Sequence, residues 1–181
     1  MVEKGIVPAL EEVGRGFEKG TIFLPQLLMS ADAAGEAFSA VRKILGRTSS
    51  STSTSPSTSS PIIIATVKGD IHDIGKNIVR ALLENYGFDV IDLGRDVPPE
   101  EIVAAAVKNG SKLVGLSALM TTTVGAMAET VRQLKEADPS ISTFVGGAVV
   151  TDEYARSIGA TYYTKDAMAS VRLAKSFFNR G

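Results

Sequence analysis

The sequence contains no cysteine, no tryptophan and only one histidine, His72, among its 181 residues. Without cysteine the chain cannot form a disulfide, a thiolate zinc site or an iron–sulfur cluster, and it has no cysteine nucleophile. A single histidine also excludes a metal site built from several imidazoles of one chain. Any histidine chemistry must therefore involve His72.

The chain also lacks an excess of charge and a long apolar run. Its 19 Lys and Arg residues balance 20 Asp and Glu residues, which excludes the overall positive charge that attracts nucleic acid or anionic membranes. The longest purely aliphatic stretch is Ile62 to Ala65, whereas a membrane span needs about 20 apolar residues. The acidic first 20 residues contain no apolar core of a secretory signal. We therefore expect a cytoplasmic protein that binds neither nucleic acid nor membrane.

A segment rich in hydroxyl side chains divides the sequence. Residues Thr48 to Ser60 are all Ser or Thr except for Pro56, and a segment without apolar groups cannot offset the entropy lost on ordering. We interpret residues 48–60 as a flexible linker, which as a coil would span roughly 20 Å. The linker predicts two units, at residues 1–47 and 61–181.

Residues 1–47 show two helical patterns. Apolar residues recur at helical spacing from Ile6 to Phe17 and again from Leu28 to Leu45, with glycines at 20 and 46 as stops. Two amphipathic helices form a hairpin that cannot bury both apolar faces alone. We therefore expect a helical cap, or half of a helix bundle, that packs on a partner surface.

After the linker, short β-rich runs alternate with helical patterns, which is typical of βαβ units and a parallel sheet. The predicted strands are Ile62–Val67, Asp89–Leu93, Leu113–Ser117, Thr143–Val145 and Thr161–Tyr163. The predicted helices are Ile74–Tyr86, Pro99–Lys108, Val124–Ala137, Asp152–Ser157 and Ala167–Phe178. We predict an α/β fold with a flavodoxin-like, five-stranded parallel sheet in the order 2-1-3-4-5, which binds ligands beyond the carboxyl ends of its strands.

The loop after the first predicted strand contains the only histidine. In one interpretation His72 is a solvated loop residue beside Asp73, which caps the next helix. In the other, its imidazole binds a metal while Asp70 accepts the proton of the second ring nitrogen. Because one protein ligand cannot hold a metal tightly, the second interpretation requires a macrocycle that supplies the remaining ligands.

Two further loops lie at the same predicted edge. The threonines of the segment Ser117 to Thr123 either cap the next helix or offer hydroxyls to a polar ligand. Gly146 and Gly147 follow the fourth strand and form either a plain turn or a place where a ligand approaches the backbone.

Taken together, three motifs resemble those of the cobalamin-binding domain: Asp-x-His-x-x-Gly at 70–75, Ser-x-Leu at 117–119 and Gly-Gly at 146–147. The resemblance covers the chain from Pro61 to about Phe178. The segments 12–20 and 23–29 also resemble the helical cap that precedes this domain in methionine synthase and in methyl-carrying corrinoid proteins. This cap favours methyl transfer over isomerisation.

The resemblance implies cobalamin bound base-off, with the nucleotide tail buried in the domain and His72 as lower axial ligand of cobalt. Asp70 and Thr123 would continue a proton relay from His72, and Phe23 would cover the upper corrin face. The other implied cofactor-binding residues are Gly69, Ile71, Asp73, Ile74, Gly75, Ser117, Leu119, Thr121, Thr122, Gly146, Gly147, Ala148 and Tyr163.

The implied function is that of a methyl shuttle. Its partners would be a donor-specific methyltransferase, an acceptor methyltransferase that uses tetrahydrofolate or a thiol, and a reductive activator. Since a complete cap has four helices, we expect either that the hairpins of two chains pair in a homodimer or that the cap is truncated. The alternatives are a cobalamin-binding sensor, the small subunit of an adenosylcobalamin-dependent mutase, and a flavodoxin-like domain without cobalamin.

Overall fold

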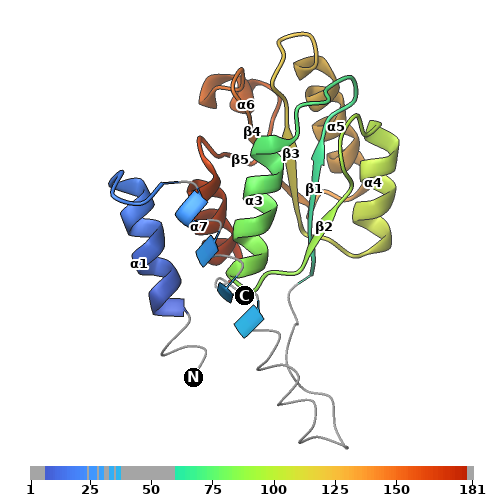
Figure 1. The fold of residues 1–181 in the computed structure, drawn as a ribbon. Coiled ribbons are helices and arrows are strands. Elements are labelled where there is room, and N and C mark those ends of the chain that lie inside the picture. Colours follow the sequence, from blue (N-terminus) through green and yellow to red (C-terminus); the bar gives the residue numbers. More distant parts are fainter. Residues whose placement is uncertain are drawn as a thin grey trace, which may run out of the picture.

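The computed structural model describes residues 7–23, 25–27, 29–30, 33–34, 36–37 and 60–178. Strands and helices alternate from residue 62 onward, and every predicted strand and helix of this region is present with ends that agree within one residue (Figure 1). The strands are β1 (Ile62–Thr66), β2 (Val90–Asp92), β3 (Leu113–Ser117), β4 (Ser142–Gly146) and β5 (Tyr162–Tyr163). The helices are α3 (Ile74–Asn85), α4 (Pro99–Lys108), α5 (Val124–Ala137), α6 (Asp152–Ser157) and α7 (Ala167–Phe178).

The five strands form one parallel sheet in the order β2-β1-β3-β4-β5, which confirms the predicted fold class. The strand order reverses between β1 and β3: β2, the next strand in sequence after β1, lies on one side of this pair, and β4, the next strand after β3, lies on the other side. Ligands of such sheets bind in the crevice at this reversal, beyond the carboxyl ends of the strands. The loops that follow β1 and β3 are therefore the first place to look for a site.

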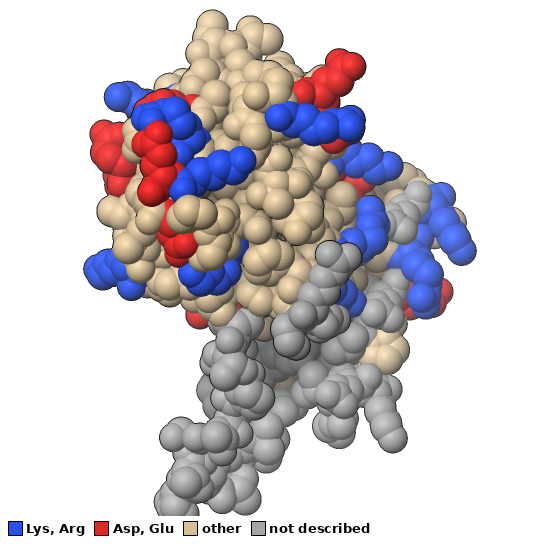
Figure 2. Space-filling model, turned by 180° about the vertical axis from the view of Figure 1, so that it is seen from behind, with Lys and Arg blue, Asp and Glu red and all other residues tan. Residues whose placement is uncertain are grey.

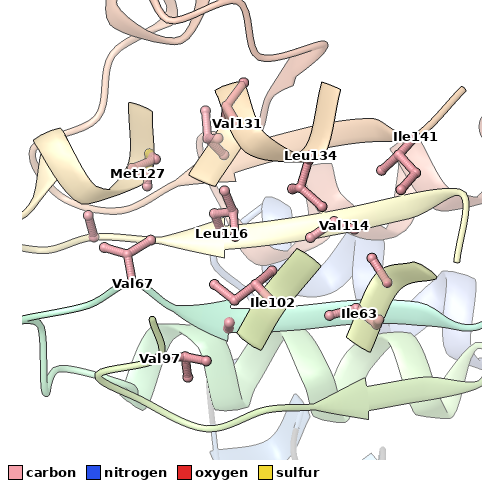
Figure 3. Packing of buried hydrophobic residues seen from close by; sticks show 14 of the residues in the cluster. Ile63, Val67, Val97, Ile102, Val114, Leu116, Met127, Val131, Leu134 and Ile141 are labelled. Atoms are coloured by element: carbon pink, nitrogen blue, oxygen red, sulfur yellow. The ribbon is translucent and has the colours of Figure 1, made fainter. Parts of the chain in front are cut away.

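Each face of the sheet has its own apolar core. On one face, residues of β1, β3 and β4 pack against α4, α5 and α6, with Ile102, Met127 and Leu134 fully buried (Figure 3). On the other face, Ile62 and Ile64 pack against Leu82 and Leu83 of α3 and against α7. The continuous aliphatic run of β1 reflects this burial on both faces, as expected for a central parallel strand.

The N-terminal region packs on the second of these faces. The helix α1 (Val7–Glu18) lies beside α7 (Figure 1), and Val13, Phe17 and Leu27 contact the apolar core around α3 and α7. Gly14 permits this approach, since a Cβ atom there would lie 2.9 Å from Met168 Cε. The expected packing of the cap on a partner surface is therefore seen, and the surface belongs to the chain's own α/β unit.

The second predicted helix of the cap is described only in part. Residues 25–27, 29–30, 33–34 and 36–37 are helical. The remainder of that helix, and the predicted linker except for Ser60, lie outside the described residues.

The view from behind the sheet shows both signs of charge around a broad uncharged centre (Figure 2). Several charges are paired on single helices, as with Arg132 of α5, which bonds Glu129 and Glu136. In the part of the chain that the structure describes, none of the helices has the length and apolarity needed to span a membrane.

Candidate cofactor-binding site

Asp70 joins the loops that follow β1 and β3. Its carboxylate is fully buried. Oδ1 accepts a hydrogen bond from the His72 backbone N–H at 3.0 Å, while Oδ2 accepts from the N–H groups of Leu119 at 2.6 Å and Met120 at 3.3 Å. The Thr123 hydroxyl lies 3.0 Å from Oδ2. One side chain therefore fastens the two loops across the reversal of the strand order.

The electrostatics of Asp70 follow from these contacts. Burial by itself raises the pKa of a carboxyl group, because it disfavours the charged form. Here hydrogen bonds from Leu119, from the backbone and ring of His72 and from Thr123 outweigh that effect and hold the pKa of Asp70 far below its usual range. Asp70 is therefore a buried carboxylate that stays ionised at neutral pH.

The imidazole of His72 is oriented by this carboxylate. Nδ1 lies 2.8 Å from Asp70 Oδ1, and the side chain remains 47% exposed. An ionised carboxylate only accepts hydrogen bonds, so in the neutral imidazole the proton resides on Nδ1. Nε2 then carries a free lone pair, and a metal ligand needs such a nitrogen.

Thr123 extends the row of polar groups behind His72. Its Oγ1 lies 3.0 Å from Asp70 Oδ2 and 2.8 Å from the Met120 carbonyl oxygen. A hydroxyl has one proton, so Thr123 donates to one of these two acceptors at a time. The predicted trio of His72, Asp70 and Thr123 is thus brought into one hydrogen-bonded row.

A cavity of about 720 Å³ opens beside His72. It runs over β1, β3 and β4 on the side of α3 and α7, and its size lies in the range of pockets that hold small-molecule ligands. Ten residues singled out from the sequence line it: Ile71, His72, Asp73, Ile74, Gly75, Ser117, Leu119, Gly146, Gly147 and Ala148.

The other residues singled out from the sequence do not line this cavity. Asp70 and Thr123 are buried behind His72, and Gly69 precedes Asp70 in the loop that follows β1. Thr121 and Thr122 are exposed, and the exposed Phe23 lies elsewhere. Tyr163 packs on the opposite face of the sheet, against the core of α4, α5 and α6. The cofactor-binding roles of all the residues singled out from the sequence, whether or not they line the cavity, stay predictions.

Several lining residues were not singled out from the sequence. They are the strand residues Ile64, Ala65, Gly115, Leu116 and Phe144, the helix residues Lys76, Val79, Ala167 and Ser170, and the loop residues Arg95, Thr164, Lys165 and Asp166. Thr164 to Asp166 follow β5 directly, so the rule that ligands bind after strand ends could have found them. The strand residues carried no such signal, because the mid-strand floor of a cavity has the same apolar pattern as a core.

Two glycines at the cavity differ in what surrounds them. Gly147 has a φ of +131°, and a Cβ atom there would lie 1.9 Å from the Ala118 carbonyl oxygen. Backbone geometry therefore requires glycine at 147. By contrast, a Cβ atom on Gly75 would meet no atom within 4 Å, so the folded chain alone does not explain this glycine.

An unpartnered hydroxyl lies next to the cavity lining. Among the described residues, Thr66 Oγ1 is the buried side-chain polar atom without a hydrogen-bond partner. Thr66 pairs in register with Ser117, a lining residue, so the two side chains lie on the same face of the sheet. Buried polar atoms are nearly always satisfied. An apolar groove with an orphan hydroxyl, an open Gly75 and a free imidazole nitrogen fits a bulky metal macrocycle with a polar tail.

Comparison with known proteins agrees with this geometry. The profile of the B12 binding domain matches residues 60–172, and a second B12 binding domain profile matches residues 1–42. The chain belongs to the B12-binding corrinoid protein family. Its cofactor is therefore a corrinoid, and residues 1–42 match a B12 binding domain model as the domain that follows does.

Relatives in this B12-binding family share most of the chain. Dimethylamine corrinoid protein 1 of Methanosarcina acetivorans is 39% identical over 97% of this chain and 81% of its own length. Dimethylamine corrinoid protein 3 of Methanosarcina mazei is 39% identical over 92% of this chain and 98% of its own length.

A solved structure is similar over nearly the whole chain. It is the methanol:cobalamin methyltransferase complex MtaBC from Methanosarcina barkeri, with a TM-score of 0.81 and 32% identity over 99% of this chain and 67% of that one.

Proposed function

We propose that this protein is the methyl carrier of a multicomponent methyltransferase system and binds its corrinoid base-off, with His72 Nε2 as the lower axial ligand. The observation that carries the ligation is the contact of 2.8 Å between His72 Nδ1 and the buried Asp70 carboxylate. This contact orients the ring, fixes its tautomer and raises the basicity of Nε2, as carboxylate partners do for metal-bound histidines. The cavity beside the ring supports a buried nucleotide tail.

The methyl-carrier role rests on the relatives. Two of them are named dimethylamine corrinoid proteins, and the MtaBC structure is that of a methanol:cobalamin methyltransferase complex. By analogy, a donor-specific methyltransferase would load this chain and an acceptor methyltransferase would unload it onto tetrahydrofolate or a thiol, with a reductive activator to restore the cofactor.

The chain's own residues would manage orientation and a proton. When bound, the corrinoid supplies a cobalt that accepts a methyl group and passes it on. His72 would bind cobalt while its Nδ1–H stays bonded to Asp70, and Asp70 keeps its negative charge close to the imidazole. Thr123 can turn its proton between Asp70 and the Met120 carbonyl, which lets the row adjust when His72 binds or leaves the metal.

The ligation is tested by absorption spectroscopy of the full chain loaded with hydroxocobalamin, with His72→Ala and His72→Gln as variants. We expect a spectrum for the wild-type protein that differs from that of either variant, together with retained colour after gel filtration. Arg132→Met, which alters only surface ion pairs of α5, serves as the control. Identical spectra for wild-type and His72→Ala protein would refute His72 ligation.

The carrier role needs a separate measurement. The loaded, chemically reduced protein is mixed with isotopically labelled methyl iodide and passed through gel filtration. We expect the label to elute with the wild-type protein and to leave it when a thiol and a corrinoid:thiol methyltransferase are added. A protein that retains colour but never takes up label would instead be a cobalamin sensor.

A further inference from the structure

Two acidic residues, Asp92 at the end of β2 and Asp96 in the turn that follows it, contact opposite ends of the loop that bears His72. This loop runs from Gly69 to Lys76, the third residue of α3. Asp96 Oδ1 accepts a hydrogen bond from the Gly69 backbone N–H at 2.6 Å, at the start of the loop. Asp92 binds Lys76, at its end. The turn Asp92–Asp96, which begins at the last residue of β2, therefore contacts both ends of the loop.

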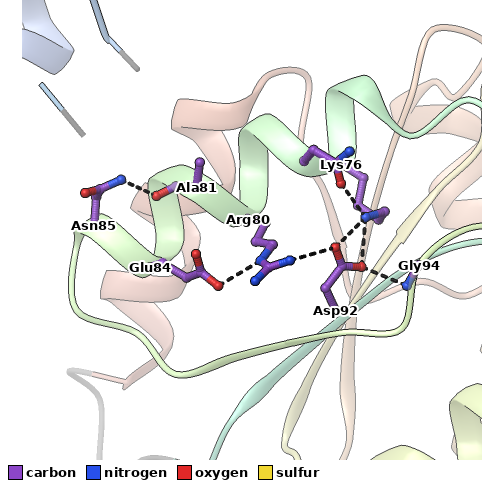
Figure 4. Close-up of polar contacts among 8 residues, drawn as sticks. Lys76, Arg80, Ala81, Glu84, Asn85, Asp92 and Gly94 are labelled. Atoms are coloured by element: carbon purple, nitrogen blue, oxygen red, sulfur yellow. Dashed lines mark hydrogen bonds and ion pairs between the residues drawn. The ribbon is translucent and has the colours of Figure 1, made fainter. Parts of the chain in front are cut away.

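The contact at the end of the loop is a buried ion pair. The Lys76 side chain is 3% exposed and that of Asp92 is 10% exposed. Lys76 Nζ donates to both carboxylate oxygens of Asp92, at 2.7 and 2.8 Å, and to Asn77 Oδ1 at 2.7 Å (Figure 4). All three ammonium protons are thus used. Lys76 lines the cavity, yet it has no proton left for a ligand, which indicates a positioning role.

Asp92 is held in turn by further groups. The Gly94 backbone N–H donates to its Oδ1 at 2.9 Å, and Arg80 Nη1 lies 3.6 Å from its Oδ2 while Arg80 Nε bonds Glu84 (Figure 4). A buried lysine needs such a fully satisfied partner, since an uncompensated buried charge is costly. Asp73, the N-cap residue of α3, makes no side-chain capping hydrogen bond, so it does not anchor the start of the helix in the way that Lys76 does.

The contact at the start of the loop uses an unusual backbone. Asp96 has a φ of +56°, a left-handed conformation that few residues other than glycine adopt, although Asp and Asn tolerate it. In this conformation Asp96 receives the Gly69 N–H with its side chain and donates its own N–H to the Asp70 carbonyl oxygen at 3.0 Å. Asp96 therefore forms hydrogen bonds with Gly69 and Asp70, the two residues that precede Ile71 and His72.

The turn itself is fastened to the sheet. The Leu93 N–H bonds the Ile64 carbonyl oxygen at 3.0 Å, the Thr66 N–H bonds Gly94, and the Val97 N–H bonds Thr66. These contacts continue the ladder between β1 and β2. The turn Asp92–Asp96 is therefore hydrogen-bonded to the sheet, whereas the loop that it contacts is largely exposed.

We infer that the turn Asp92–Asp96 is a positioning element for His72, acting through Gly69 and Asp70 at one end of the loop and through Lys76 at the other. Asp70 orients the ring, and the turn Asp92–Asp96 holds Asp70 and the ring together at the cavity. The inference concerns the fold of the loop, but its use as a ligand-positioning device rests on the proposed role of His72.

The single histidine allows a direct test without cofactor. In the apo protein labelled with ¹⁵N-histidine, NMR at about pH 8, above the usual imidazole pKa, reports the tautomer of His72 alone. We expect the Nδ1–H form in the wild-type protein and a shift toward the Nε2–H form in Asp96→Gly and Lys76→Met. The His72 backbone N–H should exchange with solvent at least about tenfold faster in both variants, as one charge-assisted hydrogen bond loosens.

The controls separate positioning from loss of stability. Asp96→Asn keeps the acceptor oxygen and tolerates the left-handed backbone, so it should match the wild type. Val131→Ala removes buried methyl groups on the opposite face of the sheet and should leave the tautomer unchanged. Asp96→Gly also relieves the positive φ, so it decides the question even where Lys76→Met fails to fold.

An unchanged tautomer and unchanged exchange in Asp96→Gly would overturn the inference, as would equal changes in Val131→Ala. The outcome is independent of the proposed function. If His72→Ala left the spectrum of the hydroxocobalamin-loaded protein unchanged, the proposed ligation would fail while the apo measurements would still decide the role of the turn.

Discussion

Asp70 is the residue on which the site depends most. A carboxylate without exposure survives only because backbone and side-chain donors replace the water it has lost. The same donors come from two different loops, so the charge of Asp70 stabilises the fold and the orientation of His72 at once.

Asp70→Asn should therefore destabilise the protein at neutral pH by about 2 to 4 kcal/mol. The side-chain amide replaces one acceptor oxygen by an NH₂ group, which is a donor and would face groups that themselves donate. The folded-state pKa of Asp70 is lowered. Its stabilisation is therefore complete above the unfolded-state pKa of about 3.9 and decreases as the pH falls toward the folded-state pKa. At about pH 3 the difference between wild type and variant should be smaller by about 1 kcal/mol.

Urea unfolding of both proteins at the two pH values measures this difference, and the other carboxyl groups cancel in the comparison. A difference that stayed constant between neutral and acidic pH would contradict the role of the ionised carboxylate.

Thr66 gives the opposite expectation. Its hydroxyl is buried without a partner, so Thr66→Val, which keeps the shape, should leave the apo protein as stable or increase the free energy of unfolding by about 1 kcal/mol. If the hydroxyl meets the corrinoid tail, the same variant should bind hydroxocobalamin more weakly. Thermal unfolding and equilibrium titration measure the two effects. A destabilised apo protein would show that Thr66 Oγ1 has a partner after all.

At the scale of elements, the loops at the carboxyl ends of β1 and β4 use glycine for different reasons. Gly75 lies in the first turn of α3 with open space around it, whereas Gly147 lies against the backbone that follows β3. Gly75 therefore borders open space at the cavity, and Gly147 marks a close approach within the fold.

Gly75→Ala should raise the free energy of unfolding of the apo protein by about 0.5 to 1 kcal/mol, because alanine favours the helix, and should weaken corrinoid binding. Gly147→Ala should cost at least about 3 kcal/mol, from backbone strain and overlap with Ala118. Urea unfolding of the apo variants and titration with hydroxocobalamin distinguish the two glycines. A lower free energy of unfolding for Gly75→Ala than for the wild type would indicate that the space around residue 75 is already filled.

At the scale of the whole molecule, α1 and the α/β unit meet at a close contact. Gly14 faces Met168 of α7 and the Tyr86 hydroxyl at the end of α3, at 2.9 and 3.1 Å from the position of an added Cβ atom. Neither neighbour belongs to the row of His72, Asp70 and Thr123, so docking of α1 can be changed without altering that row.

Gly14→Leu should displace α1 and increase amide exchange throughout this helix, because a large side chain does not fit against Met168 and Tyr86. Amides of β1 and β3 should keep their protection. Ala9→Leu, at an exposed position of the same helix, is the matched control. Hydrogen exchange followed by NMR or mass spectrometry gives the result, and unchanged exchange of α1 in Gly14→Leu would show that α1 does not depend on this contact.

The sequence alone determined the order and ends of the strands and helices from residue 62 onward, because apolar periodicity and glycine or proline stops are local signals. It also placed Asp70, His72, Ser117 and Gly146 at one edge of the sheet, since all lie at or just after the carboxyl ends of parallel strands.

Only the tertiary structure decided the contacts between distant segments. The bond from Leu119 to Asp70, the ion pair from Lys76 to Asp92 and the packing of Tyr163 away from the cavity depend on strand register and on which face each side chain takes. Those choices minimise the free energy of the whole chain: among the described residues, the buried Asp70 is held by hydrogen bonds, the buried Lys76 is paired with Asp92, and Thr66 Oγ1 is the buried side-chain polar atom left unbonded. No local pattern in the sequence encodes them.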